Sequence, residues 1–302
     1  MTDRVLPGRW IVRLGLWMAK RVPPRVGYWA CARIAGVMRC LGLRMFRVLR
    51  SNLRHVLPEA DSGTLDRLAQ KGVALAFRTY YETFRSAATR RPAAQIEMDV
   101  DCCLARWKEP SSASPGLVIG GLHMSNFDIA GAHLAHLGYD IQVLSLADPD
   151  AGTQCVNDLR RSEGLHVTPI EPKSLRAAIN RLKHGGIVLT GVDRPLPDSG
   201  APVSFFGQRA LMPEGHVRLA LQTGASFMLM ACLEVAPGLY RVIYTPPRPL
   251  ATTGDRTHDI ETNTRAILTM AEEFISRAPE QWLVFVPVWP DHGQDEPRRA
   301  AS

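Results

Sequence analysis

The 302-residue chain lacks several features that would assign it to a protein class at once. It has no run of about 18 or more apolar residues, which argues against a membrane-spanning helix. Arg13 and Lys20 interrupt the first apolar segment, so a secretory signal is not indicated. No Cys-x-x-Cys pair occurs among the six cysteines, and we expect these thiols to be reduced and mostly buried. We therefore expect a cytoplasmic chain.

Nucleotide-binding signatures are also missing. The sequence contains neither a Gly-x4-Gly-Lys loop nor a Gly-x-Gly-x-x-Gly fingerprint. Nucleotide-driven chemistry is therefore not supported.

Acidic residues are almost absent from the first 54 positions. This segment holds twelve arginine and lysine residues but only Asp3 as an acid, a net charge of +11. The whole chain carries +7, so the remaining 248 residues carry −4. A basic arm on a slightly acidic body does not indicate a nucleic-acid-binding protein.

The basic arm has amphipathic helical patterns. The first predicted helix has an apolar face formed by Trp10, Ile11, Leu14, Trp17 and Met18, and it ends at Pro23-Pro24. A second has an apolar face with Leu41, Met45, Val48, Leu49 and Leu53, and a basic face with Arg44, Arg47, Arg50 and Arg54. Such helices either lie in a bilayer interface or pack on the protein's own core. We favour docking on an anionic membrane surface, as a peripheral or monotopic protein on the cytoplasmic face of the inner (plasma) membrane.

After residue 115, short apolar runs alternate with helical patterns. The predicted strands are Leu117–Gly121, Ile141–Leu146, Val167–Ile170, Ile187–Gly191 and Phe227–Val235, with Leu239–Tyr244 as an antiparallel addition. The predicted helices are Phe127–Leu137, Asn157–Glu163, Leu175–His184, Glu214–Thr223 and Thr257–Arg277. This alternation predicts an α/β fold with a mainly parallel central sheet and helices on both faces.

Three parts of the chain can be separated by pattern. Residues 1–58 form the basic amphipathic arm, residues 59–290 form the α/β domain, and residues 291–302 form a tail. The α/β domain is expected to open with a helix capped by Asp61-Ser62 that runs to about Arg90.

One candidate for catalysis follows the first predicted strand of the sheet. His123 lies on the turn after Gly121, and Asp128 lies in the first turn of the next helix. A carboxylate bonded to one ring nitrogen fixes the tautomer of a histidine and raises the basicity of the other nitrogen. The pair is therefore either a general base with its orienting acid, or a structural histidine beside a helix N-terminal acid.

Several ordered motifs resemble the lysophospholipid-acyltransferase-like superfamily, in its branch of bacterial lipid A late acyltransferases and phosphatidylinositol mannoside acyltransferases. The matching segments are Asn52-Leu53 with Pro58-Glu59, Gly121-Leu-His123-Met-Ser125-Asn126-Phe127-Asp128, Arg160-Arg161-Ser-Glu-Gly164, Asp193-Arg194 with Val203-Ser-Phe205-Phe206-Gly207, Met212-Pro213-Glu-Gly215, and Pro279-Glu280-Gln281-Trp282. Phe127 stands where the branch has Trp. The branch usually has His and Arg after the last motif, but here Phe285-Val-Pro287-Val-Trp289 follows.

The resemblance implies a glycerol-3-phosphate-acyltransferase-like fold and an O-acyltransferase. Its co-substrate would be acyl-CoA or acyl carrier protein, with no other cofactor, and its acceptor a hydroxyl of a membrane glycolipid or lysolipid. His123 would deprotonate this hydroxyl while Asp128 orients the ring, and Asn126 would organise the site. No Gly-x-Ser-x-Gly elbow supports a covalent route through Ser125.

Further polar residues are candidates for binding substrate. Arg160 and Arg161 have forked donors suited to phosphate, or they form a solvated helix end; the resemblance favours one arginine, and we prefer Arg161. Asp193 and Arg194 end a predicted strand on the same sheet edge as His123. Asp198 lies in a loop where relatives carry a further acid, although a surface turn explains it equally well.

Two other functions are compatible with the sequence. His133 and His136 have the i, i+3 spacing of two metal ligands, which suggests a metal-dependent hydrolase, but no third ligand is evident and we predict no metal site. The altered C-terminal segment leaves open a non-catalytic lipid-binding paralogue. The intact His123–Asp128 motif favours the enzyme.

Overall fold

The computed structural model describes residues 9–90, 92–149, 151–196 and 200–289, and it describes side chains from residue 14 onward except at 101 and 102. The predicted tail, 291–302, lies outside the described residues. The helices are α1 Arg9–Arg21, α2 Pro24–Cys40, α3 Arg44–Val56, α4 Ser62–Thr89, α5 Asp101–Leu104, α6 Phe127–His136, α7 Ala151–Ser162, α8 Pro172–Lys183, α9 Gly215–Thr223 and α10 Arg256–Arg277, with 3₁₀ turns η1 Ala105–Trp107 and η2 Pro279–Gln281. The strands are β1 Gln95–Glu97, β2 Leu117–Gly121, β3 Ile141–Ser145, β4 His166–Pro169, β5 Ile187–Gly191, β6 Ala201–Phe205, β7 Gln208–Met212, β8 Ser226–Ala236 and β9 Leu239–Tyr244.

The central sheet confirms the predicted α/β fold. In the described part of the chain its strand order is β1-β9-β8-β2-β5-β3-β4. The strands from β8 to β4 are mutually parallel, whereas β9 pairs antiparallel with β8, as predicted. The bounds of β2 and β5 coincide with the predicted ranges.

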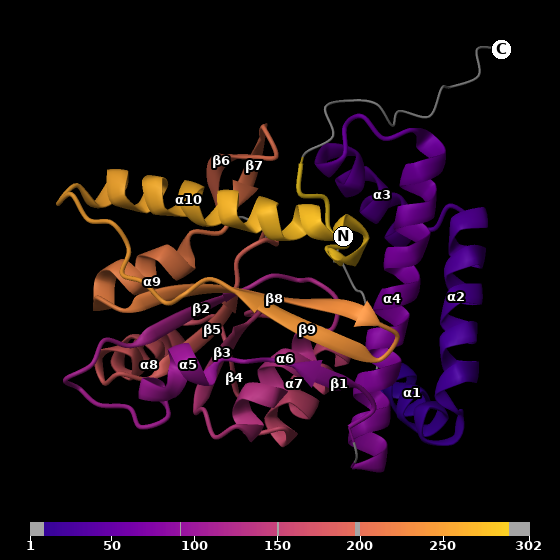
Figure 1. Ribbon diagram of the computed structural model, residues 1–302, viewed down its shortest axis with the longest axis horizontal. Coiled ribbons are helices and arrows are strands. Elements are labelled where there is room, and N and C mark those ends of the chain that lie inside the picture. The colour runs from indigo at the N-terminus through magenta and orange to yellow at the C-terminus, as the bar shows by residue number, and fades with distance from the viewer. Residues whose placement is uncertain (1–8, 91, 150, 197–199, 290–302) are drawn as a thin grey trace.

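Helices cover both faces of this sheet, as predicted (Figure 1). Along β2, Val118 packs into a core with residues of α8, α9 and α10. Leu117 and Ile119 point the other way, into a core that includes residues of α6. Because both faces are covered, the strands are apolar along their whole length rather than alternating.

The β6–β7 hairpin was not predicted. Its turn lies at Phe206-Gly207, where both residues have positive φ, 49° and 70°. Two positive φ angles are typical of the two-residue hairpin turn that follows the strand twist. Sequence patterns do not predict this hairpin, because phenylalanine is unusual at the first turn position and Pro202 argues against a strand over β6.

Helix α3 corrects one expectation for the basic arm. Its apolar face is buried against the rest of the helical layer, with Phe46 5%, Leu49 0% and Leu53 0% exposed. Arg50 donates to Asp66 of α4 at 2.5 Å. The apolar face of α3 therefore packs on the protein itself and is not available to a bilayer.

The long helix α4 lies beside the carboxyl ends of the parallel strands (Figure 1). Asp61 caps its first turn, as predicted, by accepting a hydrogen bond from the Thr64 amide at 2.9 Å. Helices α1, α2 and α3 pack on α4. The N-terminal helices are thus held next to the sheet edge where α/β enzymes gather reactive groups.

Asn52 joins this helical layer to the segment after η2. Its amide donates to the carbonyls of Val284 and Val286, both at 2.9 Å, and its Oδ1 accepts from the Val288 amide at 3.2 Å. The side chain is 2% exposed. Loss of the side chain would leave buried backbone groups without partners.

We expect Asn52→Ala to lower the free energy of unfolding by about 2–4 kcal/mol, because unpaired buried polar groups cost about 1–3 kcal/mol each. Urea denaturation followed by circular dichroism measures this change. Arg54→Ala, at an exposed position of the same helix, is the matched control and should change stability little. Equal stability of both variants would contradict the bridging role of Asn52.

Candidate active site

Strands β2 and β5 lie side by side and end together. Gly121 of β2 is the register partner of Gly191 of β5. Two residues beyond each glycine stand His123 and Asp193. The parallel pairing therefore brings an imidazole and a carboxylate to the same point of the sheet edge.

Gly191 is required by this close approach. A Cβ atom added at Gly191 would lie 2.7 Å from Cε1 of His123, which is closer than van der Waals contact allows. A Cβ at Gly121 would meet its nearest neighbours at 3.9 Å, an ordinary contact. The His123 ring thus packs over bare backbone of β5.

His123 and Asp193 make a two-point contact. Nδ1 of His123 lies 2.7 Å from Oδ1 of Asp193, and the His123 backbone amide donates to Oδ2 at 2.8 Å. The carboxylate therefore selects the tautomer with the proton on Nδ1. The His123 side chain is 23% exposed, and no partner among the described residues binds its Nε2.

Asp193 is fully buried and receives a third hydrogen bond from the indole of Trp282, at 2.8 Å. Such donors are what make burial of an ionised carboxylate tolerable. Trp282 belongs to a segment that also pairs with the His123 turn: the Leu283 amide donates to the His123 carbonyl at 2.8 Å. The predicted Pro279–Trp282 motif is therefore part of the site.

Asp128 has a different partner from the one we expected. Its Oδ1 accepts from Nε of Arg160 at 2.7 Å, and Arg160 also lies over the Phe127 ring, 5.8 Å from its centroid. The hydrogen bond to the His123 ring is made by Asp193 instead. Asp128 sits in the first turn of α6, and from there it meets α7.

The two candidate arginines are separated by the geometry of α7. Arg160 points to the Asp128 side and donates from Nη1 to Asn157 at 2.8 Å. Arg161 points away: it is exposed, and it donates to Asp158 and to the carbonyl of Val167. We preferred Arg161 as the site arginine, but it is Arg160 that lies beside Asp128 and the turn after His123.

Three other predicted residues have distinct surroundings. Asn126 is 2% exposed and uses both ends of its amide, accepting from the Ile129 amide at 3.4 Å and donating to Glu82 at 3.2 Å. Arg194 follows Asp193 and is partly buried. Asp198 lies outside the described residues.

The histidine pair considered for a metal lies on α6. His136 is exposed and its Nε2 is 3.0 Å from Glu163. Burial lowers the pKa of His133 below its usual value. Within the described residues, no group of three or more His, Cys, Asp and Glu residues is placed to hold a metal ion.

Sequence reasoning missed the role of Glu82, which contacts Asn126 from α4. A glutamate in an apolar helical stripe is the signal that marks it. Sequence reasoning also missed that Asp193, not Asp128, bonds to His123. The matching Gly-x-His and Gly-x-Asp ends of two neighbouring strands are the signal for this pair.

A histidine–carboxylate pair at the carboxyl edge of an α/β sheet is an arrangement suited to activating a hydroxyl. A family model described as bacterial lipid A biosynthesis acyltransferase matches residues 3–290, and the chain belongs to this family. It is an acyltransferase, as predicted. In the described part of the chain, no helix has the length and hydropathy needed to cross a membrane.

Curated relatives narrow the resemblance. The chain is 27% identical over 254 residues to the phosphatidylinositol mannoside acyltransferase of Mycolicibacterium smegmatis. The matched region covers 83% of this chain and 81% of that protein. It is 28% identical over 247 residues to the phosphatidylinositol mannoside acyltransferase of Mycobacterium tuberculosis, covering 80% and 76%. The predicted branch of acyltransferases is thus confirmed.

We expect Gly191→Ala to lower acyl transfer at least about tenfold, because a misplacement of about 1 Å can reduce rate about 100-fold. The added methyl group would push the His123 ring from its position over β5. Gly121→Ala is the matched control at the register partner, where the space for a methyl group exists. The comparison uses initial rates of the two folded variants, and equal rates would contradict the packing argument.

Proposed function

We propose that this acyltransferase moves a fatty acyl group from a thioester donor to a hydroxyl of a membrane glycolipid, with His123 as the general base. The observation that carries the proposal is the Nδ1 contact between His123 and the buried Asp193, at 2.7 Å, which leaves Nε2 available to a substrate. We assign the orienting role to Asp193 rather than to Asp128.

In the proposed reaction, Nε2 of His123 accepts the proton of the acceptor hydroxyl as its oxygen attacks the thioester carbonyl. Asp193 holds the ring and stabilises the imidazolium that forms. The new C–O ester bond forms, the C–S bond breaks, and the proton passes from His123 to the leaving thiolate. The products are the acylated lipid and the free thiol. No acyl-enzyme is needed, because the acceptor is itself the nucleophile.

Arg160 is proposed to bind a phosphate group of the donor or acceptor. It is held by Asp128 and Asn157 through Nε and Nη1. Neither contact uses Nη2, and the side chain is 19% exposed. Burial lowers the pKa of Arg160, but the charge and hydrogen bond of Asp128, together with Tyr80, outweigh burial and raise this pKa overall.

The acceptor is proposed to be a glycosylated phospholipid. The two curated relatives are named for acylating phosphatidylinositol mannoside, and the family model is named for lipid A biosynthesis. Both kinds of acceptor are glycolipids with sugar hydroxyls. The donor is proposed to be acyl-CoA or acyl carrier protein.

We expect His123→Ala to reduce transfer by about 10²–10⁴-fold, the usual contribution of a general base.

Asp193→Asn should lower kcat by about 100-fold or more, because the wrong tautomer of His123 becomes favoured. Asp128→Asn should act mainly on KM, because it loosens Arg160. Transfer from palmitoyl-CoA to purified phosphatidylinositol monomannoside measures all three. A larger loss of kcat in Asp128→Asn than in Asp193→Asn would return the orienting role to Asp128.

An anionic membrane surface is the proposed docking partner. Large exposed apolar side chains on α1, α2 and the α2–α3 turn support this proposal. In the described part of the chain, nine of the eleven exposed large apolar residues fall between positions 14 and 43. We call these nine the apolar docking surface: Leu14, Trp17, Met18, Val26, Trp29, Ile34, Val37, Leu41 and Leu43. Helices α1 and α2 both pack on α4, and exposed apolar patches typically mark an interaction site.

Basic residues border this surface. Arg21 lies over the Trp17 ring, 4.5 Å from its centroid, and Arg33 lies 5.4 Å from the centroid of Trp29. The segment between Arg4 and Pro58 contains no acid. Tryptophan beside arginine on an amphipathic helix suits the headgroup region of an anionic leaflet. The α1 residue Leu16 shares a hydrophobic cluster with Cys155 and Leu159 of α7, so α1 adjoins the helix that carries Arg160.

We expect Trp17→Ser combined with Trp29→Ser to weaken binding to phosphatidylglycerol vesicles at least about tenfold. Each of these exposed Trp side chains would bury apolar area on entering the bilayer interface. Vesicle co-sedimentation measures the affinity. Leu211→Ser combined with Val235→Ser removes the two exposed apolar residues outside the docking surface and serves as the control. Unchanged binding by the tryptophan variant would contradict docking through α1 and α2.

A further inference from the structure

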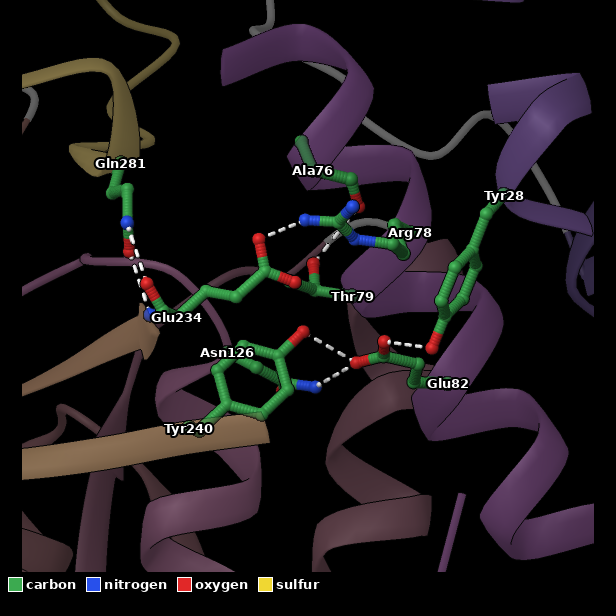
Figure 2. A network of polar contacts seen from close by, with 9 residues as sticks. All are labelled: Tyr28, Ala76, Arg78, Thr79, Glu82, Asn126, Glu234, Tyr240 and Gln281. Atoms are coloured by element: carbon green, nitrogen blue, oxygen red, sulfur yellow. Dashed lines mark hydrogen bonds and ion pairs between the residues drawn. The ribbon is translucent and has the colours of Figure 1, made fainter. Parts of the chain in front are cut away.

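Glu82 of α4 is a buried carboxylate that the proposed reaction does not use. Its side chain is 1% exposed and accepts three hydrogen bonds (Figure 2). The donors are the Tyr28 hydroxyl at 2.6 Å, the Tyr240 hydroxyl at 2.5 Å and the Asn126 amide at 3.2 Å. These donors come from α2, from β9 and from the turn that carries His123.

The Asn126 contact connects Glu82 to the active site. Oδ1 of Asn126 caps α6, and Nδ2 donates to Glu82, so the side chain is held at both ends. Asn126 is three residues after His123. The position of its side chain therefore restrains the turn between β2 and α6.

Strain in this turn makes such a restraint necessary. Ser125 has φ 50°, a left-handed conformation that is strained for a residue other than glycine. Surrounding contacts must hold it there. On one side the Ser125 amide donates to the Gln281 carbonyl at 2.7 Å, and on the other side Asn126 is fixed by Glu82.

Neighbouring charges complete the cluster. Glu234 forms an ion pair with Arg78, and the Gln281 side chain bonds to both backbone groups of Glu234, at 2.7 and 3.0 Å (Figure 2). Burial raises the pKa of Glu82, while the hydrogen bonds and Arg78 oppose the rise. Buried polar clusters often add no stability relative to well-packed apolar side chains. Its geometry, rather than its stability, is therefore the property to explain.

We propose that Glu82 is a positioning residue of the acyl transfer reaction: through Asn126 it holds the strained turn at Ser125 and so sets the location of His123. This inference rests on the proposed role of His123 as the base. Glu82 touches neither the reacting atoms nor the His123 ring. Through Tyr28 the same carboxylate also attaches the turn to α2, one of the two docking helices.

The test replaces the cluster without leaving unpaired polar groups around it. In Tyr28→Phe/Glu82→Leu/Tyr240→Phe, the carboxylate and two of its donors become apolar together, which is compatible with stable packing. Asn126 alone loses its acceptor. We expect kcat to fall at least about tenfold with little change in KM, because a loosened turn misplaces the base.

The double variant Tyr28→Phe/Tyr240→Phe is the matched control. It keeps Glu82 and its bond to Asn126 but removes the two hydroxyl donors, so its kcat should stay clearly above that of the triple variant. Glu82→Gln is the conservative variant: its amide oxygen can still accept from Asn126, and it should retain most of kcat. Thermal unfolding by circular dichroism verifies that each variant is folded.

Two readouts keep this test independent of the acceptor. Rates are measured for transfer from palmitoyl-CoA to phosphatidylinositol monomannoside, and for thiol release from palmitoyl-CoA when water replaces the acceptor. Failure of transfer by the natural enzyme, with thiol release intact, would reject the proposed acceptor and leave the Glu82 comparison valid in the second assay. Full thiol release by His123→Ala would reject the proposed base.

The Glu82 proposal is overturned if the folded triple variant keeps the natural kcat, or if the double control loses as much as the triple variant. If the triple variant does not fold, Glu82→Asp and Glu82→Gln decide the question. Aspartate withdraws the carboxylate by one methylene from Asn126, so kcat should be lower for Glu82→Asp than for Glu82→Gln. The reverse order would overturn the proposal.

Discussion

The carboxylate of Asp193 has no contact with solvent, and its burial is possible because three donors surround it: the backbone amide and ring of His123 and the indole of Trp282. These donors lie on segments far apart in sequence. Satisfying one buried charge therefore fixes the end of β5, the turn after β2 and the segment after α10 relative to one another. An unpaired carboxylate in this place would cost several kcal/mol, so the three segments must assemble together.

Two carboxylates at the same sheet edge have separate partners. Asp193 bonds to His123, and Asp128 bonds to Arg160. In the reaction we propose, His123 of the first pair accepts the proton of the acceptor hydroxyl. Arg160 of the second pair binds a substrate phosphate. The division follows from the fold, because β5 lies beside β2 whereas α6 leads away from the strand toward α7.

The N-terminal helices serve two structural purposes. Helix α3 buries its apolar face against α4, while α1 and α2 leave large apolar side chains exposed beside basic ones. The same α4 carries Glu82 to the turn after His123. The exposed apolar side chains and the restraint on the turn after His123 are thus both attached to α4, and in the function we propose this places the docking helices next to the base.

The sequence by itself determined the fold class, the bounds of β2 and β5, the Asp61 cap and the grouping of His123 with Asp193 at one edge. These follow from hydrophobic periodicity, capping chemistry and the parallel sheet, all of which act locally or through simple topology. Only the tertiary structure decided that Asp193 rather than Asp128 bonds to His123, that Glu82 holds Asn126, and that α3 faces inward. Motif spacing gives distance along the chain, whereas these contacts depend on how β5, α4 and α7 pack in space.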